Sequence, residues 1–314
     1  MSQQRFLRST SMFYGLVGSL FFSTQAAYAA DAGYKPGEVR STAAVDGVNA
    51  KIDGLGGTFA NKDIYGGRGV LTLPLGHQYG LQLDGAAGNF DSRFFGSTAA
   101  HLFWRDPSRA LFGIYAGHTY WNSRVGGIHV NQVAAEMEVY YGQWTLQGIL
   151  GVEFGNSRTA TVGDMVQTYN IETRFTDQVN LNYYLNDNWK MFVGHRYLGG
   201  QHALALGTEL GFALGNGQMG ALFVEGRVGE GDFHGIWGGL KLYLGQKDKT
   251  LIRRHREDDP IDWAPATLFS LTNSGSSTPV GPSATECLPD GPCGDGDGDG
   301  DGDGDGDGDG DGPE

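Results

Sequence analysis

Between residues 47 and 245, apolar and polar side chains alternate in segments of roughly ten residues, the segment length typical of membrane-spanning strands. Gly, Asn, Asp or Pro turns separate the segments. Successive side chains of a β-strand point to opposite faces of its sheet, so this period of two predicts strands joined as hairpins. We predict an all-β chain of about twelve strands, at 47–56, 67–75, 78–89, 95–105, 110–121, 128–141, 143–153, 173–184, 188–197, 202–214, 217–227 and 233–244.

The predicted connections are of two kinds that alternate along the chain. Tight turns are expected at 76–77, 106–109, 142, 185–187 and 215–216, whereas longer polar loops are expected at 57–66, 122–127 and 154–172. Outer-membrane barrels have short periplasmic turns and longer outer loops. The pattern therefore favours a closed antiparallel transmembrane β-barrel over residues 47–245.

The two faces of each strand differ in polarity. In the strand near residue 150, Trp144, Leu146 and Leu150 share one face, while Thr145 and Gln147 share the other. A soluble sandwich would bury the apolar face, but a barrel in lipid turns that face outward and keeps polar residues in the lumen. Aromatic residues near the strand ends favour the lipid version, because interfacial girdles are rich in them: Trp104, Tyr141, Trp144, Tyr183, Trp189 and Tyr243 at one end, and Phe90, Phe94, Tyr120, Trp121, Phe154 and Tyr197 at the other.

The polar faces carry charges of both signs, which we predict to line the lumen. These residues are Lys51, Asp53, Arg68, Asp84, Arg105, Glu136, Glu138, Glu153, Arg174, Lys190, Arg196, Glu209, Glu225, Arg227 and Lys241. One interpretation is a structural network of paired charges. The other is a charge-lined passage for small solutes. Twelve strands lie between filled eight-stranded barrels and open sixteen-stranded ones, so strand number leaves both interpretations open.

The N-terminus has the pattern of a secretory signal peptide over residues 1–29. Arg5 and Arg8 precede a short apolar core at 12–22, and Ala27-Tyr28-Ala29 is a cleavage signal. The apolar core is shorter than the roughly 18–20 residues of a spanning helix. Residues 30–46 are expected to form a flexible lead. The mean hydropathy of −0.31 suits both a soluble exported protein and a barrel whose strands are apolar on one face.

With its signal, alternating strands, aromatic girdles and the junction KTLIRRHREDDP, the chain resembles the small, porin-like and poorly characterised outer-membrane β-barrel proteins of Gram-negative bacteria. The resemblance covers residues 1 to about 260. It implies contact with outer-membrane lipid, assembly by the barrel assembly machinery, and no cofactor. Such barrels commonly end at an aromatic C-terminal residue, whereas the last strand here closes at Leu244, beside Tyr243.

After Gly245 the alternation stops, and we expect residues 246–293 to be a periplasmic extension. An even strand number would place both termini in the periplasm. The basic run at 253–256 and the acidic run at 257–259 are interpreted as a self-compensating solvated segment, or as a docking segment for an anionic surface or a periplasmic partner. Cys287 and Cys293 flank a Pro-Asp-Gly turn, which favours a small-loop disulfide over a metal site.

The tail at 294–314 alternates Gly with Asp and has no apolar residue, so we expect disorder and at most weak divalent-cation binding. This tail supplies nine Asp and Glu314 to the net charge of −14. The sequence has no basic stripe with interleaved aromatics, the pattern that would suggest nucleic-acid binding.

Barrel hydrolases are the alternative functional class. Resemblance to outer-membrane phospholipases would require an H-x-S pattern, which the sequence lacks; His118 and Ser123 have the wrong spacing. Omptin proteases need acidic pairs and a His at the outer rim, and only Asp232-Phe233-His234 comes near this. We therefore expect a noncatalytic barrel: a small-solute channel, a structural envelope protein, or an anchor for an interaction tail.

Overall fold

The computed structural model describes residues 41–245, 247–261, 263 and 267–280. The predicted signal peptide, most of the lead at 30–46, the pair Cys287 and Cys293, and the Gly-Asp tail lie outside the described residues.

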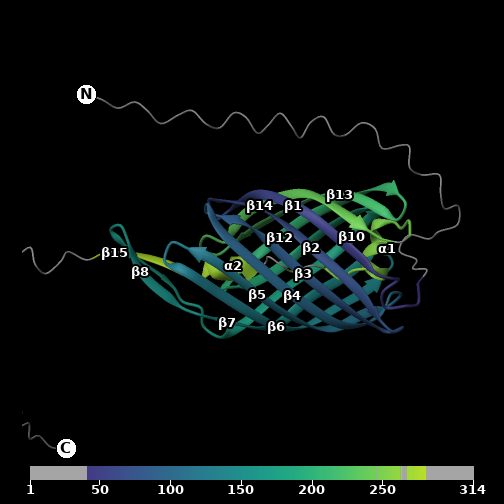
Figure 1. Ribbon diagram of the computed structural model, residues 1–314, viewed down its shortest axis with the longest axis horizontal. Helices are drawn as coiled ribbons and strands as arrows, with labels where there is room; N and C mark the ends of the chain where they lie inside the picture. The colour runs from purple at the N-terminus through teal and green to yellow at the C-terminus, as the bar shows by residue number, and fades with distance from the viewer. Residues whose placement is uncertain (1–40, 246, 262, 264–266, 281–314) are drawn as a thin grey trace, which may run out of the picture.

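Twelve strands form one closed antiparallel barrel, as the alternation predicts (Figure 1). Around the barrel the order is β1-β14-β13-β12-β11-β10-β7-β6-β5-β4-β3-β2, and β1 closes the sheet by pairing with β14. The strands are β1 Asn49–Phe59, β2 Lys62–Leu75, β3 Tyr79–Phe90, β4 Arg93–Asp106, β5 Ala110–Ser123, β6 Gly126–Tyr141, β7 Trp144–Gly155, β10 Arg174–Asn186, β11 Trp189–Leu198, β12 Gln201–Gly215, β13 Gln218–Gly229 and β14 His234–Leu244.

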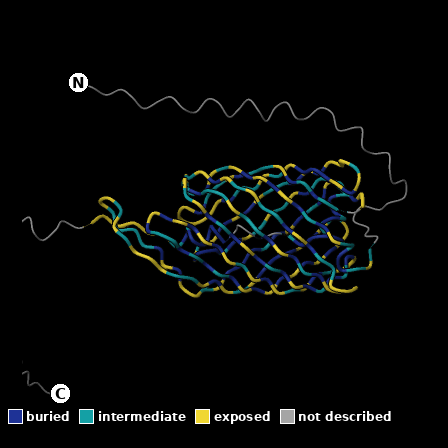
Figure 2. Tube along the Cα trace, viewed as in Figure 1, coloured by how far each residue is buried: buried dark blue, intermediate teal, exposed yellow. Residues whose placement is uncertain are grey.

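Buried and exposed residues alternate along these strands (Figure 2). In β7, Leu146 and Leu150 face outward, whereas Thr145 and Gln147 are buried in the interior. The outer surface therefore carries a large set of exposed Leu, Val, Ile and aromatic side chains, which suits a lipid environment. The predicted girdles are partly wrong: Phe90, Trp121 and Tyr243 are buried inside the barrel, and the exposed aromatics near the rims include Phe94, Tyr120, Tyr141, Trp144 and Phe154.

The predicted long loops at 57–66 and 122–127 are also wrong. The strands run on to two-residue turns, such as Ala60-Asn61 and Asp91-Ser92, in which both residues have positive φ. Such turns match the twist of the strands that they join. Among the described connections, only 156–173 is long, and it folds as a hairpin of β8 (Arg158–Val162) and β9 (Met165–Tyr169). We call the end of the barrel that carries this hairpin the hairpin end, and the opposite end the short-turn end.

The chain after β14 does not extend away from the barrel but runs back through its lumen (Figure 1). Helix α1 (Leu251–Glu257) lies at the short-turn end, and α2 (Thr267–Asn273) lies inside the hairpin end. Strand β15 (Gly275–Pro279) then pairs with β9 of the hairpin. We call the described residues between 247 and 280 the plug.

For its described residues, the plug corrects the prediction that 246–293 form an extension beyond the barrel, whereas 281–293 lie outside the described residues. Its polar groups have partners on the lumen wall at successive heights. Ile261 N–H donates to Glu138, Trp263 Nε1–H to Glu136 and Ser270 O–H to Glu153, the last of these towards the hairpin end. The described chain therefore begins at the short-turn end and stops at the opposite end, where Val280 N–H donates to the Asp164 carbonyl. No described helix is both long and apolar enough to cross a membrane.

Candidate functional site

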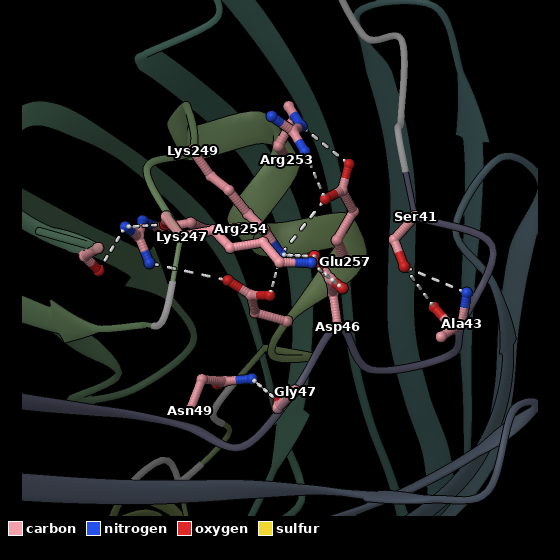
Figure 3. A network of polar contacts seen from close by, with 12 residues as sticks. Ser41, Ala43, Asp46, Gly47, Asn49, Lys247, Lys249, Arg253, Arg254 and Glu257 are labelled. Atoms are coloured by element: carbon pink, nitrogen blue, oxygen red, sulfur yellow. Dashed lines mark hydrogen bonds and ion pairs between the residues drawn. The ribbon is translucent and has the colours of Figure 1, made fainter.

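A cluster of charges fixes the plug to the short-turn end of the barrel (Figure 3). Lys249 Nζ lies 3.0 Å from Asp46 Oδ2 and 3.3 Å from Glu257 Oε2, and it also pairs with Asp258. Lys247 Nζ is 2.8 Å from Asp46 Oδ1 but is mostly exposed. The backbone N–H of Asp46 also donates to the Glu257 carbonyl. We call these five residues the latch, which joins the N-terminal lead to the plug.

The latch shifts the acidities of its members. Burial opposes the charged form of Lys249, but the carboxylates of Asp258, Glu257 and Asp46 outweigh it and raise the pKa of this ammonium. Burial would raise the pKa of Asp46, yet hydrogen bonds from Lys247 and Lys249 hold it below its usual value. Burial raises the pKa of Asp258 to about 6, although Lys249 works in the opposite direction. Asp258 is therefore a latch carboxyl whose pKa lies closer to neutral than is usual for Asp.

The arginines of the plug bind backbone carbonyls of the short turns. Arg254 Nη2 donates to the Gly217 carbonyl at 2.9 Å, and Arg256 Nη2 donates to those of Gly142 and Trp144, each at 2.9 Å. A guanidinium has five N–H donors in a fixed fork, which suits it to several carbonyls at once. Arg254 and Arg256 are buried, so the interpretation of the basic run as a solvated or partner-docking segment is wrong for these two residues.

His255 points to an interior group of hydroxyls and charges. Its Nδ1 lies 2.7 Å from the Tyr184 hydroxyl and its Nε2 2.9 Å from that of Tyr243. Burial lowers the pKa of His255 well below its usual value, and the neighbouring Lys190 adds to this effect. His255 is therefore held neutral within the plugged barrel.

One wall of the lumen, formed by β3–β7, is predominantly acidic. Asp84, Glu136, Glu138 and Glu153 are buried there, with Arg105 as the cation among the predicted charges. His101 bridges two of these carboxylates, with Nε2 3.1 Å from Asp84 and Nδ1 2.9 Å from Glu136. The plug presents donors to this wall, namely the N–H groups of Ile261 and Trp263 and the Ser270 hydroxyl. We call β3–β7 the acidic wall.

The wall formed by β11–β14, β1 and β2 is predominantly basic. Its six cations are Lys51, Arg68, Lys190, Arg196, Arg227 and Lys241, against the carboxylates Asp53, Glu209 and Glu225. Two carboxylates are each shared by two cations: Glu209 by Lys190 and Lys241, and Glu225 by Arg196 and Arg227. Arg68 pairs with Asp53 at 2.8 Å. The plug presents acceptors here, because Lys51 donates to the Pro260 carbonyl and lies 3.8 Å from Asp259.

The structure places all fifteen predicted lumen charges on barrel strands. Twelve are buried, and Arg68, Arg174 and Glu225 are half-buried. Arg174, on β10 between the two walls, lies 3.7 Å from Glu153. Arg105 donates to the carbonyls of Ala44 and Asp258, which brings the wall, the lead and the plug together. Sequence parity gave no information on how these charges divide between two walls.

The hairpin end is closed by apolar packing around α2. The Phe269 ring lies 4.1 Å from that of Phe59 and 5.0 Å from that of Trp237, centroid to centroid. Leu268 and Leu271 are fully buried in the same cluster. The sequence analysis missed this seal. The apolar run Leu268-Phe269 with Leu271, within an otherwise polar segment, is the signal that could have revealed it.

A cavity of about 100 Å³ remains between the plug and the basic wall. All six cations of that wall line it, together with four carboxylates, Glu138, Glu209, Glu225 and Asp259. At about 10–15 Å³ of such volume per water, this space would hold on the order of seven to ten waters. The described residues of the plug therefore occupy the lumen and leave a polar space beside the basic wall.

The residues considered for catalysis do not lie together in a site that resembles an active site. Phe233 is buried in the apolar cluster of the hairpin end, and the His234 N–H donates to the Asp232 carbonyl. His118 bonds Asn131 at 2.8 Å on the exposed side of the barrel. Among the described residues, no group of three or more His, Cys, Asp or Glu side chains could hold a metal ion.

No protein-family model and no curated protein matches this chain. Several solved barrels are similar in shape. An outer membrane channel from Pseudomonas putida F1 has 10% identity and a TM-score of 0.46, covering 68% of this chain and 98% of its own. The KdgM porin in complex with disordered oligogalacturonate has 10% identity and a TM-score of 0.41, covering 62% and 98%. The translocator domain of the autotransporter NalP from Neisseria meningitidis has 16% identity and a TM-score of 0.40, covering 63% and 87%.

Proposed function

We propose that this protein is a noncatalytic outer-membrane β-barrel that acts as a small-solute channel and is held closed by its own plug. The observation that carries this proposal is the route of residues 247–280 through a lumen lined by charged side chains. No plug residue belongs to the twelve barrel strands, so displacing the plug would leave the barrel closed on itself and its polar interior open to water.

The polar interior supports a channel, and the tight contacts of the plug define the closed state. A lumen built only for stability would be filled by side chains of the strands, as in eight-stranded barrels. Here a separate segment fills it, held by hydrogen bonds and ion pairs at one end and by apolar packing at the other. A permanently plugged structural envelope protein is the second candidate, and the same contacts favour it if the plug never leaves.

The barrel is proposed to be inserted with its hairpin end outside the cell. Outer-membrane barrels have their longer connections on the outer side, and 156–173 is the long connection here. The described part of the lead, 41–46, would then lie on the periplasmic side and Val280 on the outer side. This replaces the expectation that both termini are periplasmic. Outer-membrane lipid and the barrel assembly machinery remain the proposed partners, and weak divalent-cation binding by the Gly-Asp tail remains a proposal.

The channel is tested by planar-bilayer conductance of two refolded proteins, the full chain and a chain ending at residue 246. We expect rare, brief openings from the full chain and sustained conductance from the shortened one. Heat-modifiable gel migration checks that both barrels have folded. A folded but silent shortened barrel would contradict the channel and favour the structural alternative.

The orientation is tested separately with single cysteines in a Cys287→Ser, Cys293→Ser background. Ser276→Cys lies on exposed β15 and Lys247→Cys at the opposite end, where the native side chain is exposed. A membrane-impermeant thiol reagent should label Ser276→Cys in intact cells and Lys247→Cys only after permeabilisation. The reverse pattern would show that the barrel has the opposite orientation.

A further inference from the structure

The cavity beside the basic wall contains donors that the protein itself does not use. Arg196 Nε, Arg227 Nη1, Gln147 Nε2 and Gln178 Nε2 are buried and have no hydrogen-bond partner among the described residues. All four side chains line the cavity. Leaving a buried donor unpaired costs free energy, more so for a charged group. These donors indicate an acceptor in the cavity, while the unpaired acceptors Gln178 Oε1 and Asn180 Oδ1, whose side chains also line it, require a donor such as a bound water.

The two arginines are held close together with part of each guanidinium unused. Arg227 Nε and Nη2 lie 2.9 and 2.8 Å from Glu225 Oε1, and Arg196 Nη2 lies 3.5 Å from the same oxygen. Arg196 Nη1 donates to the carbonyls of Val179 and His195. These contacts fix both guanidinium groups and leave one nitrogen of each, Arg196 Nε and Arg227 Nη1, without a partner among the described residues.

Small residues and strand register make room for this arrangement. Ala203 and Ala205 of β12 lie between the two arginines, since Arg196 pairs with Ala203 and Arg227 with Ala205. Gln178 of β10 lies directly opposite Arg196 on the other side. Gln147 of β7 lies opposite Asn180 of β10, so the four unused donors come from β7, β10, β11 and β13, which are neighbouring strands of the barrel together with β12.

The charges of the cavity select the sign of its occupant. Six cations and four carboxylates line it, so the surplus is positive, and Glu209 and Glu225 are each already shared by two cations. Guanidinium groups bind carboxylate and phosphate with matched, charge-assisted hydrogen bonds. An acceptor with negative charge therefore fits this space better than a neutral or cationic group.

We propose that Arg196, Arg227, Gln147 and Gln178 form a binding site for an oxyanion group, a phosphate or a carboxylate, inside the plugged barrel. The cavity has room for one such group with a few waters, not for a large solute. The preference for anionic solutes that this implies rests on the proposed channel function. The binding site itself does not, because it exists in the closed barrel.

The test uses inorganic phosphate and the full chain, folded in detergent and checked by heat-modifiable migration. Isothermal titration at constant ionic strength, with chloride as the balancing anion, should show saturable binding of phosphate. Arg196→Gln and Arg227→Gln should each weaken it by about tenfold or more, because a hydrogen bond to a charged group is lost. Arg158→Gln, at an exposed arginine of β8, is the matched control and should bind as the wild type does.

Gln178→Leu covers the case in which the arginine variants do not fold. Neither polar atom of the Gln178 side chain has a hydrogen-bond partner among the described residues, so replacing the amide breaks no hydrogen bond with them. This variant should fold and bind phosphate more weakly. Absence of saturable binding to the folded wild type would mean that water alone fills the cavity. That result, or unchanged binding in all the cavity variants that fold, would overturn the site. Neither outcome affects the conductance test of the channel.

Discussion

The two ends of the lumen are closed by different physical means. At the short-turn end, the latch and the arginines of α1 hold the plug through ion pairs and hydrogen bonds to turn carbonyls. At the hairpin end, α2 packs its Leu and Phe side chains into an aromatic cluster. Charge interactions respond to pH and salt, whereas apolar packing responds to neither to the same degree. The short-turn end is therefore the end at which solution conditions would release the plug.

The largest effect is expected at the hairpin end. Phe269→Ala removes a fully packed ring and should destabilise the closed state there by about 3–5 kcal/mol. Hydrogen exchange of the α2 amides should rise by roughly two to four orders of magnitude, since it reports local opening. Exchange in α1 should change little, and added salt should not alter the effect. Phe112→Ala, at an outward-facing ring, is the control. Equal loosening of α1 and α2 would show that the two ends open as one unit.

A pH-dependent effect of intermediate size is expected at the latch. Asp258 binds its proton more tightly when buried, with a pKa of about 6, than when released. This group therefore stabilises the closed latch most below about pH 4. Its contribution, roughly 3 kcal/mol, is lost as the pH rises through about 6. Asp258→Asn lacks this titration. The ratio of α1 protection in the variant to that in the wild type should rise about a hundredfold from pH 4 to 7.

The comparison at equal pH removes the opposing contribution of His255. Because the pKa of this imidazole is lowered in the closed barrel, its release is favoured by acid below about pH 6.5 in both proteins. The groups that face Asp258 are Lys249, Arg254 and Asp259. A protection ratio that does not vary with pH would mean that Asp258 keeps the same acidity in the closed and open latch.

The smallest effect is expected from the exposed member of the latch. Lys247 pairs with Asp46, but its side chain is 61% exposed, so the pair should contribute only about 0.2–1 kcal/mol. Lys247→Met should raise exchange in α1 by less than about fivefold at low salt and leave it unchanged at high salt. A larger, salt-resistant effect would show that the whole latch depends on this lysine.

The sequence by itself determined the strands and their faces. Alternation with a period of two is a local property, so residues such as Leu150 and Gln147 could be assigned to opposite faces without knowing their neighbours. The same parity assigned fifteen charged residues to the polar face; twelve of them are buried in the structure, and His101, which lies between Asp84 and Glu136, was not among them. The sequence predictions failed at the hairpin end. There the strands continue into two-residue turns instead of long loops, and Phe90 and Trp121 point into the barrel instead of toward lipid.

Only the tertiary structure decided what fills the lumen and how its charges are arranged. Several partners of the plug are more than a hundred residues away in sequence, as with Trp263 and Glu136 or Arg256 and Gly142. No local pattern encodes such pairs, and a charged segment reads as solvated until its partners are known. The two walls likewise depend on the order of strands around a closed barrel, which places β1 beside β14 and joins Lys51 to the basic side. Acidic and basic residues are spread along the chain. They lie on opposite walls of the lumen because closing the barrel brings strands that are distant in sequence, such as β1 and β14, side by side.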